Sequence, residues 1–120
     1  MGLPWVRLDT AFPRNHKVLG LLDDKDGYRT AFVYTCALAY SGEQGTAGFI
    51  PRSALPFIHA RQVDVNRLVA ARLFICEPRG GGWNVNDWAD FQPTTEENER
   101  RSQRAKDAAA VRWAKNGAKK

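Results

Sequence analysis

The stretch LFICEPRGGGWNVNDW, residues 73–88, places two apolar runs on either side of a glycine-rich loop. Two such runs around a short loop that contains glycine are typical of a β-hairpin. We therefore expect strands over residues 73–77 and 83–88, joined by residues 78–82. Trp83 and Trp88 have apolar neighbours, so packing is favoured for them over stacking on nucleic-acid bases.

Two helices and a turn are expected before the hairpin. Residues 52–59 follow Pro51, which suits the first turn of a helix because it has no N–H to leave unpaired. A turn at residues 60–61 leads to a helix over residues 63–74, where apolar side chains recur at helical spacing. One stripe of this helix holds Val65, Leu68, Val69 and Leu73. The opposite side, which we expect to be free, holds Asp64, Arg67 and Ala71.

The N-terminal part predicts further short elements. Residues 5–9 alternate apolar and polar side chains, which is the period of a half-buried strand. Residues 16–22 carry a short apolar stripe at helical spacing. Residues 28–40 are apolar nearly all round, as in a central helix, and Ser41-Gly42 is expected to end that helix. Phe49-Ile50 is long enough only for a β-bridge or an edge strand.

The order strand, helix, helix, edge strand, helix, turn, helix, hairpin is that of a winged helix domain. We expect a mainly α fold with a small β-hairpin wing (α+β), a winged helix-turn-helix domain, over residues 1–92. Residues 93–120 are expected to form a long basic C-terminal helix and tail. Thr94 and Glu97 offer a capping box at its start, and Asn116-Gly117 offers a stop.

Charge is distributed unevenly along the chain. Residues 1–97 hold ten Lys and Arg against eleven Asp and Glu, a net charge of −1, whereas residues 98–120 hold eight against two, a net charge of +6. Such a segment attracts polyanions, so nucleic acid, here double-stranded DNA, is the first expected partner, and the anionic face of a partner protein is the second. The basic residues expected to contact DNA phosphates are Arg100, Arg101, Arg104, Lys106, Arg112, Lys115, Lys119 and Lys120. The alternatives are a solvated helix and an oligomerisation helix with a narrow apolar seam of Ala105, Ala108, Ala109 and Trp113.

The winged domain is expected to supply further DNA contacts. Arg61, Asn66 and Arg67 lie at the start or on the free side of the expected recognition helix, where Arg suits guanine or phosphate and Asn suits adenine. Arg79 at the glycine-rich tip suits a phosphate or the minor groove, and Arg52 begins the preceding helix. The alternatives are a structural helix with solvated charges and a flexible hairpin turn.

The chain also resembles a known group of proteins. The residues that carry the resemblance are Trp5 with Asp9, then 16–19, 48–51, 68–74, Gly82-Trp83, 86–88, 91–93, 100–101 and 110–113. They are similar to those of small winged helix-turn-helix proteins of actinobacterial phages and prophages, related in style to the N-terminal domains of phage replisome organisers. Such relatives tend to have a proline before Lys17, a glycine where Arg72 stands and a histidine where Asn86 stands. The resemblance implies a DNA-binding protein that acts in phage replication or transcription control.

No enzymatic activity, metal or cofactor is expected. The candidate zinc ligands, which lack the usual short ligand pairs, are His16, Cys36, His59 and Cys76. The acidic cluster Asp23, Asp24 and Asp26 lacks the downstream glutamate of a calcium loop. Structural burial and a solvated turn are the favoured interpretations.

The compartment and the partners follow from the same composition. The chain has neither a secretory signal pattern nor an apolar run near the ~20 residues of a membrane span. We therefore expect the cytoplasm or nucleoid of a bacterial host, and no membrane partner. The sequence leaves open whether the chain forms a homodimer. The alternative function is a protein-interaction factor that binds a host or replisome protein through the winged domain and the C-terminal helix.

Overall fold

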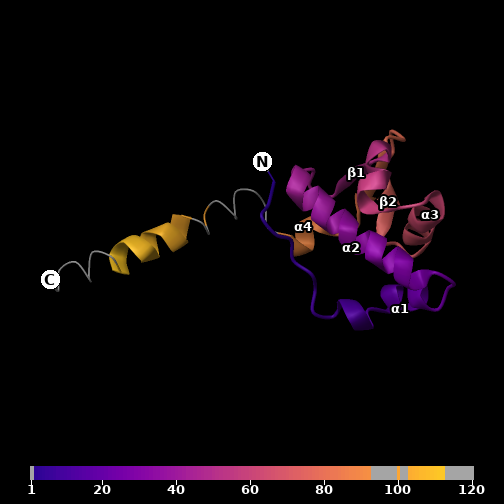
Figure 1. The fold of residues 1–120 in the computed structure, drawn as a ribbon, viewed down its shortest axis with the longest axis horizontal. Helices are drawn as coiled ribbons and strands as arrows, with labels where there is room; N and C mark the ends of the chain where they lie inside the picture. Colours follow the sequence, from indigo (N-terminus) through magenta and orange to yellow (C-terminus); the bar gives the residue numbers. More distant parts are fainter. Residues whose placement is uncertain (1, 93–99, 101–102, 113–120) are drawn as a thin grey trace.

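The computed structural model describes residues 2–92, 100 and 103–112, and Figure 1 shows how their helices and strands are arranged. The protein combines helices with a small three-stranded antiparallel sheet, which confirms the expected α+β class. The elements in chain order are the 3-10 helix η1 (Phe12–Arg14), α1 (His16–Leu22), α2 (Gly27–Gln44), β1 (Phe49–Pro51), the 3-10 helix η2 (Arg52–Ile58), α3 (Gln62–Ala70), β2 (Phe74–Cys76), β3 (Gly82–Val85) and α4 (Trp88–Phe91). Residues 100 and 103–112 are also helical.

The sheet has the strand order β1-β3-β2, and both strand pairs are antiparallel. β2 and β3 form the hairpin that the sequence predicts, and β1 is the predicted edge strand. Ile50 in β1 lies opposite Trp83 in β3, and both side chains are buried. The two strands approach closely at Gly82, where a Cβ would collide with the carbonyl oxygen of Ile50. Only glycine fits at this position.

The hydrophobic core lies between α2, α3 and the sheet. Val33 of α2, Val65 and Leu68 of α3, Ile58 of η2 and Phe74 of β2 are each at most 1% exposed. α2 packs against α1, α3, η2 and β1, so the prediction of a central helix is confirmed. Burial of these apolar side chains supplies the main favourable contribution to folding.

Residues 5–9 do not form the predicted strand. Gln92 explains the difference, because its Oε1 accepts a hydrogen bond from the Arg7 N–H at 2.8 Å and its Nε2 donates one to the Arg7 carbonyl at 2.7 Å. Gln92 is only 5% exposed. A buried carboxamide thus bonds both backbone groups that a neighbouring strand would otherwise bond.

The predicted stop at Ser41-Gly42 is wrong, because α2 continues to Gln44. Gly42 is buried, and a Cβ at this position would collide with the side chain of Val6. Its role is to let the N-terminal segment pack closely against α2. The helix ends at Gly45, which adopts the left-handed conformation with φ 69°.

α3 ends earlier than the sequence predicts, at Ala70. Arg72 follows it in the left-handed conformation, with φ 63°. The N–H of Arg72 donates to the Val69 carbonyl at 3.0 Å, and the N–H of Leu73 donates to the Leu68 carbonyl at 2.9 Å. These two bonds define a Schellman motif, whose left-handed position usually holds glycine. Because Arg72 occupies this position in place of glycine, the sequence shows no helix stop here. The predicted helix therefore extends to residue 74, beyond its observed end at Ala70.

The structure differs from the predicted elements at three further points. The predicted helix over residues 52–59 is a 3-10 helix that ends at Ile58. Trp88 begins α4 and does not end the hairpin. Asp64, predicted on the free side of its helix, is 0% exposed. The capping box at Thr94 and Glu97 and the stop at Asn116-Gly117 lie outside the described residues.

Candidate nucleic-acid interface

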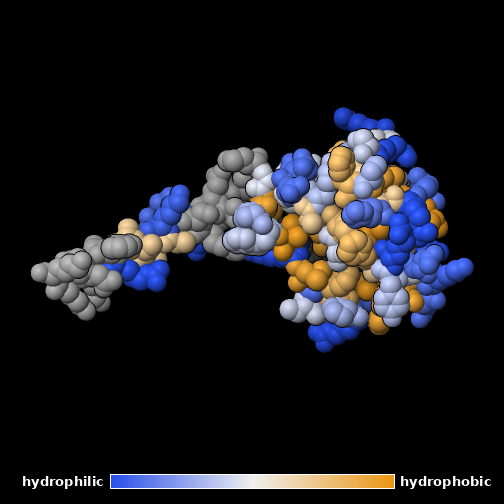
Figure 2. Space-filling model, viewed as in Figure 1, coloured by the Kyte–Doolittle hydropathy of each residue, from blue (hydrophilic) through white to orange (hydrophobic). Residues whose placement is uncertain are grey.

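α3 lies at one edge of the fold, with the β2–β3 hairpin on one side and α1 on the other (Figure 1). The same edge is mostly hydrophilic in Figure 2, whereas apolar residues lie over the middle of that view. The DNA contacts predicted within residues 1–92 come from α3, the turn before it, the hairpin tip and the start of η2.

The buried carboxylate of Asp64 fixes the start of α3 against α2. Thr30 Oγ1 in α2 donates a hydrogen bond to Asp64 Oδ1 at 3.0 Å. The backbone N–H of Arg61 donates to Oδ2 at 2.8 Å, and the guanidinium of Arg61 donates to both carboxylate oxygens at 3.1 Å. Arg29 Nε of α2 lies 3.7 Å from Oδ2. Asp64 therefore anchors α3 and does not present a charge to a ligand.

The hydrogen bonds around Asp64 also determine its ionisation. Burial of the carboxylate would raise the pKa of Asp64, but the hydrogen bonds from the Arg61 side chain, the Arg61 backbone and Thr30 outweigh that effect and lower the pKa to about 2. The carboxylate is therefore ionised at neutral pH. In the opposite direction, the hydrogen bond to Asp64 raises the pKa of the Arg61 guanidinium. Arg61, a predicted DNA contact, is thus engaged with Asp64.

Arg67 extends from α3 into a groove between α1 and the end of α3, which we call the α1–α3 groove. It has a volume of about 510 Å³. The lining residues of the groove that carry or can acquire charge are His16, Lys17, Asp24, Arg67 and Arg72. Arg67 Nη1 is buried and has no hydrogen-bond partner among the described residues. Three cations against one carboxylate make this groove a suitable place for a phosphate group.

Sequence reasoning missed Lys17 and Arg72 as candidate contacts. Arg72 is distinguished by its left-handed position in the Schellman motif. That conformation costs a residue with a Cβ about 1–2 kcal/mol relative to glycine. A strained residue at a surface groove is a reason to look for a function of its side chain. The signal at Lys17 is weaker, since only the packing of α1 beside α3 brings it to the groove.

The hairpin tip is held in place by side chains on both of its flanks. The carboxylate of Glu77 accepts hydrogen bonds from Asn84 Nδ2 at 3.0 Å and from the Arg79 N–H at 3.4 Å. Arg52 Nε donates to the Gly80 carbonyl at 3.0 Å, and its guanidinium lies 5.0 Å from the ring centre of Trp83. Arg79 is exposed at this tip, as the sequence predicts. Arg52 thus supports the tip, and Trp83 belongs to the core.

The outward face of α3 is uncharged. Its exposed residues are Gln62, Val63, Asn66 and Ala70. Gln62 Nε2 donates a hydrogen bond to Asn66 Oδ1 at 2.9 Å. Of the side chains predicted to contact bases, Asn66 is therefore the one that this face presents.

The predicted phosphate contacts of the C-terminal part fall partly within the described residues. Arg100, Arg104, Lys106 and Arg112 are exposed there on helical backbone. Gln103 Nε2 donates to Asp107 Oδ1 at 2.9 Å on the same helix. Arg101, Lys115, Lys119 and Lys120 lie outside the described residues.

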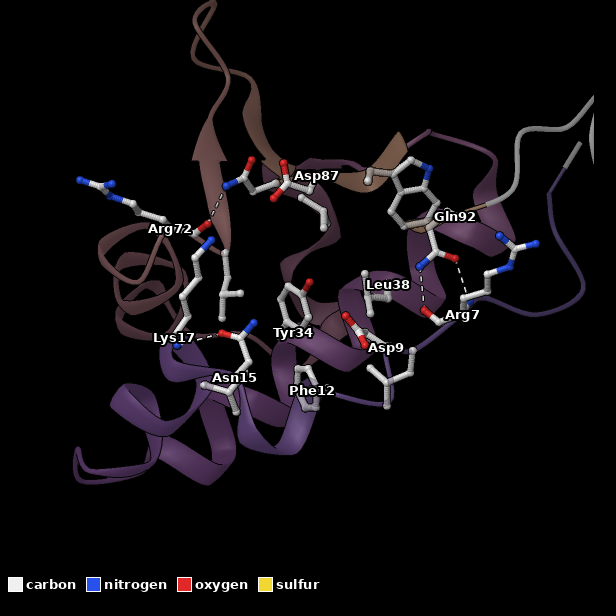
Figure 3. A pocket seen from close by; sticks show the side chains of 16 residues that line it. Arg7, Asp9, Phe12, Asn15, Lys17, Tyr34, Leu38, Arg72, Asp87 and Gln92 are labelled. Carbon is white, nitrogen blue, oxygen red and sulfur yellow. Dashed lines mark hydrogen bonds between the residues drawn. The ribbon is translucent and has the colours of Figure 1, made fainter. Parts of the chain in front are cut away.

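A separate, smaller cavity of about 130 Å³ lies between the N-terminal segment, α2 and the start of α4 (Figure 3). Phe12 and Tyr34 stack in its wall with ring centres 5.7 Å apart. Burial, and to a lesser extent the charge of Asp87, raises the pKa of Tyr34. In Figure 3 the carboxylates of Asp9 and Asp87 face the cavity, whereas the guanidinium of Arg72 points away from it. Arg72 lines both this cavity and the α1–α3 groove.

The candidate metal ligands named from the sequence do not form a metal site in the described part of the chain. Among the described residues, no three His, Cys, Asp or Glu side chains are placed to hold a metal ion. The four candidate zinc ligands are thus not brought together, and both Cys36 and Cys76 are free thiols. The predicted burial of these residues is wrong, because His16, His59 and Cys76 are exposed and Cys36 is only partly buried. In the same described part of the chain, no helix has the length and apolar character needed to cross a membrane.

Comparison with known proteins gives no relative: no family model, no curated protein and no solved structure matches the chain. The resemblance to phage winged helix-turn-helix proteins stays an expectation from the sequence. The chemistry of the site therefore follows from its own residues.

Proposed function

We propose that the protein is a winged helix-turn-helix protein that binds double-stranded DNA, with α3 as the recognition helix and the β2–β3 hairpin as the wing. The observation that carries the proposal is the position of α3 between two basic regions, the α1–α3 groove and the hairpin tip. The element order supports it, because η2 and α3 follow β1 as a helix-turn-helix and the hairpin returns β3 to lie beside β1.

In this arrangement α3 enters the major groove, which has the width to admit an α-helix. Lys17, Arg67 and Arg72 then contact phosphates on the α1 side of α3. Arg79 at the wing contacts the DNA on the other side, while Arg52 holds the wing in position. The basic residues after residue 98 add phosphate contacts, which are independent of base sequence.

We further propose phage replication or transcription control as the setting in which DNA is bound. Support for this part of the proposal comes from the sequence resemblance alone. Both settings require binding to DNA sites, so the first experiment is the same for either.

Fluorescence anisotropy with a labelled random-sequence DNA duplex tests the proposal on the whole chain. We expect binding at about 50 mM salt that weakens steeply at about 200 mM, because phosphate contacts release counterions. Lys17→Ala and Arg67→Ala should each weaken binding. Lys25→Ala is the matched control, since Lys25 is exposed in the turn between α1 and α2 and does not line the α1–α3 groove. Absence of binding at low salt, even at high micromolar protein, would contradict the proposal.

A second candidate function, a protein-interaction factor for a host or replisome protein, is favoured by a different surface. Tyr28 and Phe32 of α2 are 75% and 56% exposed, and Phe57 of η2 is 73% exposed. Phe57 also stacks near Tyr40, with ring centres 6.4 Å apart. Exposed aromatic side chains that gather on one surface are typical of protein interfaces.

Two variants separate the candidate functions. Phe57→Ser should leave DNA binding unchanged but abolish association with a protein partner or with a second copy of the chain. Arg67→Ala should have the opposite effects. Sedimentation of the wild type and both variants, with and without duplex DNA, measures self-association and DNA binding in the same samples.

A further inference from the structure

The outward face of α3 has an unusual chemical character for a DNA-contacting surface. Two of its exposed residues, Gln62 and Asn66, are carboxamides, and the other two, Val63 and Ala70, are apolar. None of the four carries a charge. The face therefore differs from the basic surfaces beside it.

The arginines nearest to this face are committed elsewhere. The guanidinium of Arg61 forms two hydrogen bonds of 3.1 Å with the buried carboxylate of Asp64. Arg67 lines the α1–α3 groove, where its Nη1 is buried. Arginine is the side chain that most commonly contacts guanine, through two hydrogen bonds to O6 and N7. The exposed face of α3 thus lacks the group best suited to a G·C pair.

We propose that α3 recognises A·T base pairs in the major groove, an inference that rests on the proposed DNA-binding function. Adenine presents the N7 acceptor next to the N6 amino donor, and a carboxamide is the side chain that matches both. Thymine adds a methyl group, which favours apolar contact. The face offers both kinds of group, and it offers them side by side.

The hydrogen bond between the two carboxamides arranges them for this task. Gln62 Nε2 donates to Asn66 Oδ1 at 2.9 Å, which leaves Gln62 Oε1 as an acceptor and Asn66 Nδ2 as a donor. Asn66 Nδ2 can then donate to adenine N7 while Gln62 Oε1 accepts from the N6 amino group. Val63 and Ala70 flank this pair with methyl groups for thymine.

The length of the face limits the number of base pairs that it contacts. From Gln62 to Ala70 the helix rises about 12 Å, at about 1.5 Å per residue. Base pairs are stacked about 3.4 Å apart, so the face spans roughly three to four of them. We therefore expect a short A·T-rich core within a binding site that is otherwise held by phosphate contacts.

Selection from a pool of random DNA duplexes, with sequencing before and after binding to the whole chain, tests the inference. We expect the recovered duplexes to share a core of three or four A·T pairs. Asn66→Ala should reduce the ratio of affinities for the selected and random duplexes by about 10-fold, since one good carboxamide–adenine pair contributes discrimination of that order. Asn66→Arg should shift the preferred base at one position to guanine. Arg67→Ala is the matched control, which should weaken both affinities by one factor and leave the ratio unchanged.

The outcomes distinguish this inference from the function on which it rests. Recovery of a G·C core, or a selected sequence that Asn66→Ala and Asn66→Arg do not alter, overturns A·T recognition while DNA binding stands. Salt-sensitive binding with no enrichment of any sequence also overturns it. If no duplex binds at low salt, both the inference and the proposed function fail.

Discussion

Thr30 in α2 donates a hydrogen bond of 3.0 Å to the carboxylate of Asp64 in α3, and both side chains are fully buried. This bond joins the central helix to the helix that we propose to enter DNA. Because Asp64 also bonds the backbone and guanidinium of Arg61, it caps the start of α3 at the same time. The orientation of the uncharged α3 face therefore depends on the hydrogen bonds and ion pairs of one buried carboxylate.

Asp64→Asn should lower the free energy of unfolding at pH 7 by about 2 kcal/mol, because it removes the charge that Arg61 and Thr30 stabilise. Chemical denaturation followed by tryptophan fluorescence measures the change. Asp23→Asn is the control, since Asp23 is exposed at the end of α1. Equal stability of the two variants would contradict the anchoring role of Asp64.

The same carboxylate predicts how stability depends on pH. The pKa of Asp64 is lowered from its ordinary value of 3.8 to about 2, so the folded state favours the ionised form. Its contribution is fully present above about pH 4 and is lost as the pH falls towards 2. The unfolding free energies of the wild type and Asp64→Asn should therefore converge across this window. A difference that stays constant down to pH 2 would show that ionisation of Asp64 contributes nothing.

Local signals in the sequence predicted much of this fold. The bounds of α1 and the pairing of β2 with β3 follow from short apolar runs between turn residues, and such signals do not depend on distant contacts. The strand expected at residues 5–9 failed because its partner is a single side chain, Gln92, far away in the sequence. No pattern within residues 5–9 carries that information.

The site was predicted less completely than the fold, for a related reason. Arg79 and Asn66 are exposed where the sequence places them. Asp64 was placed on the free side because helical spacing alone does not show that Thr30, Arg29 and Arg61 compensate a buried charge. Lys17 joins Arg67 only through the packing of α1 beside α3.

Arg72→Gly should raise the free energy of unfolding by about 1 kcal/mol, because glycine adopts the left-handed conformation without a steric penalty. If Arg72 also contacts a phosphate, the same variant should weaken DNA binding. Stability and binding would then change in opposite directions. Thermal unfolding and anisotropy with a random duplex measure the two effects.

Arg72→Ala separates the backbone from the side chain at this position. Alanine keeps a Cβ in the left-handed conformation, so it should weaken DNA binding as much as glycine does without the gain in stability. If Arg72→Gly is more stable and binds DNA as the wild type does, the strain at Arg72 has no connection with DNA binding.

Arg79 at the hairpin tip and Arg52 of η2, which contacts that tip, have different tasks in the proposed wing. Arg79→Ala should reduce the slope of log affinity against log salt by about 1, as expected for the loss of one phosphate contact, and should leave stability unchanged. Arg52→Ala should lower the unfolding free energy by about 1 kcal/mol, since it loses the hydrogen bond to Gly80 and the contact with the Trp83 ring. Arg52→Ala should affect DNA binding only by loosening the hairpin tip that carries Arg79. The double variant Arg52→Ala/Arg79→Ala should therefore bind DNA no more weakly than Arg79→Ala alone. An additive loss of affinity in the double variant would instead assign Arg52 a direct phosphate contact.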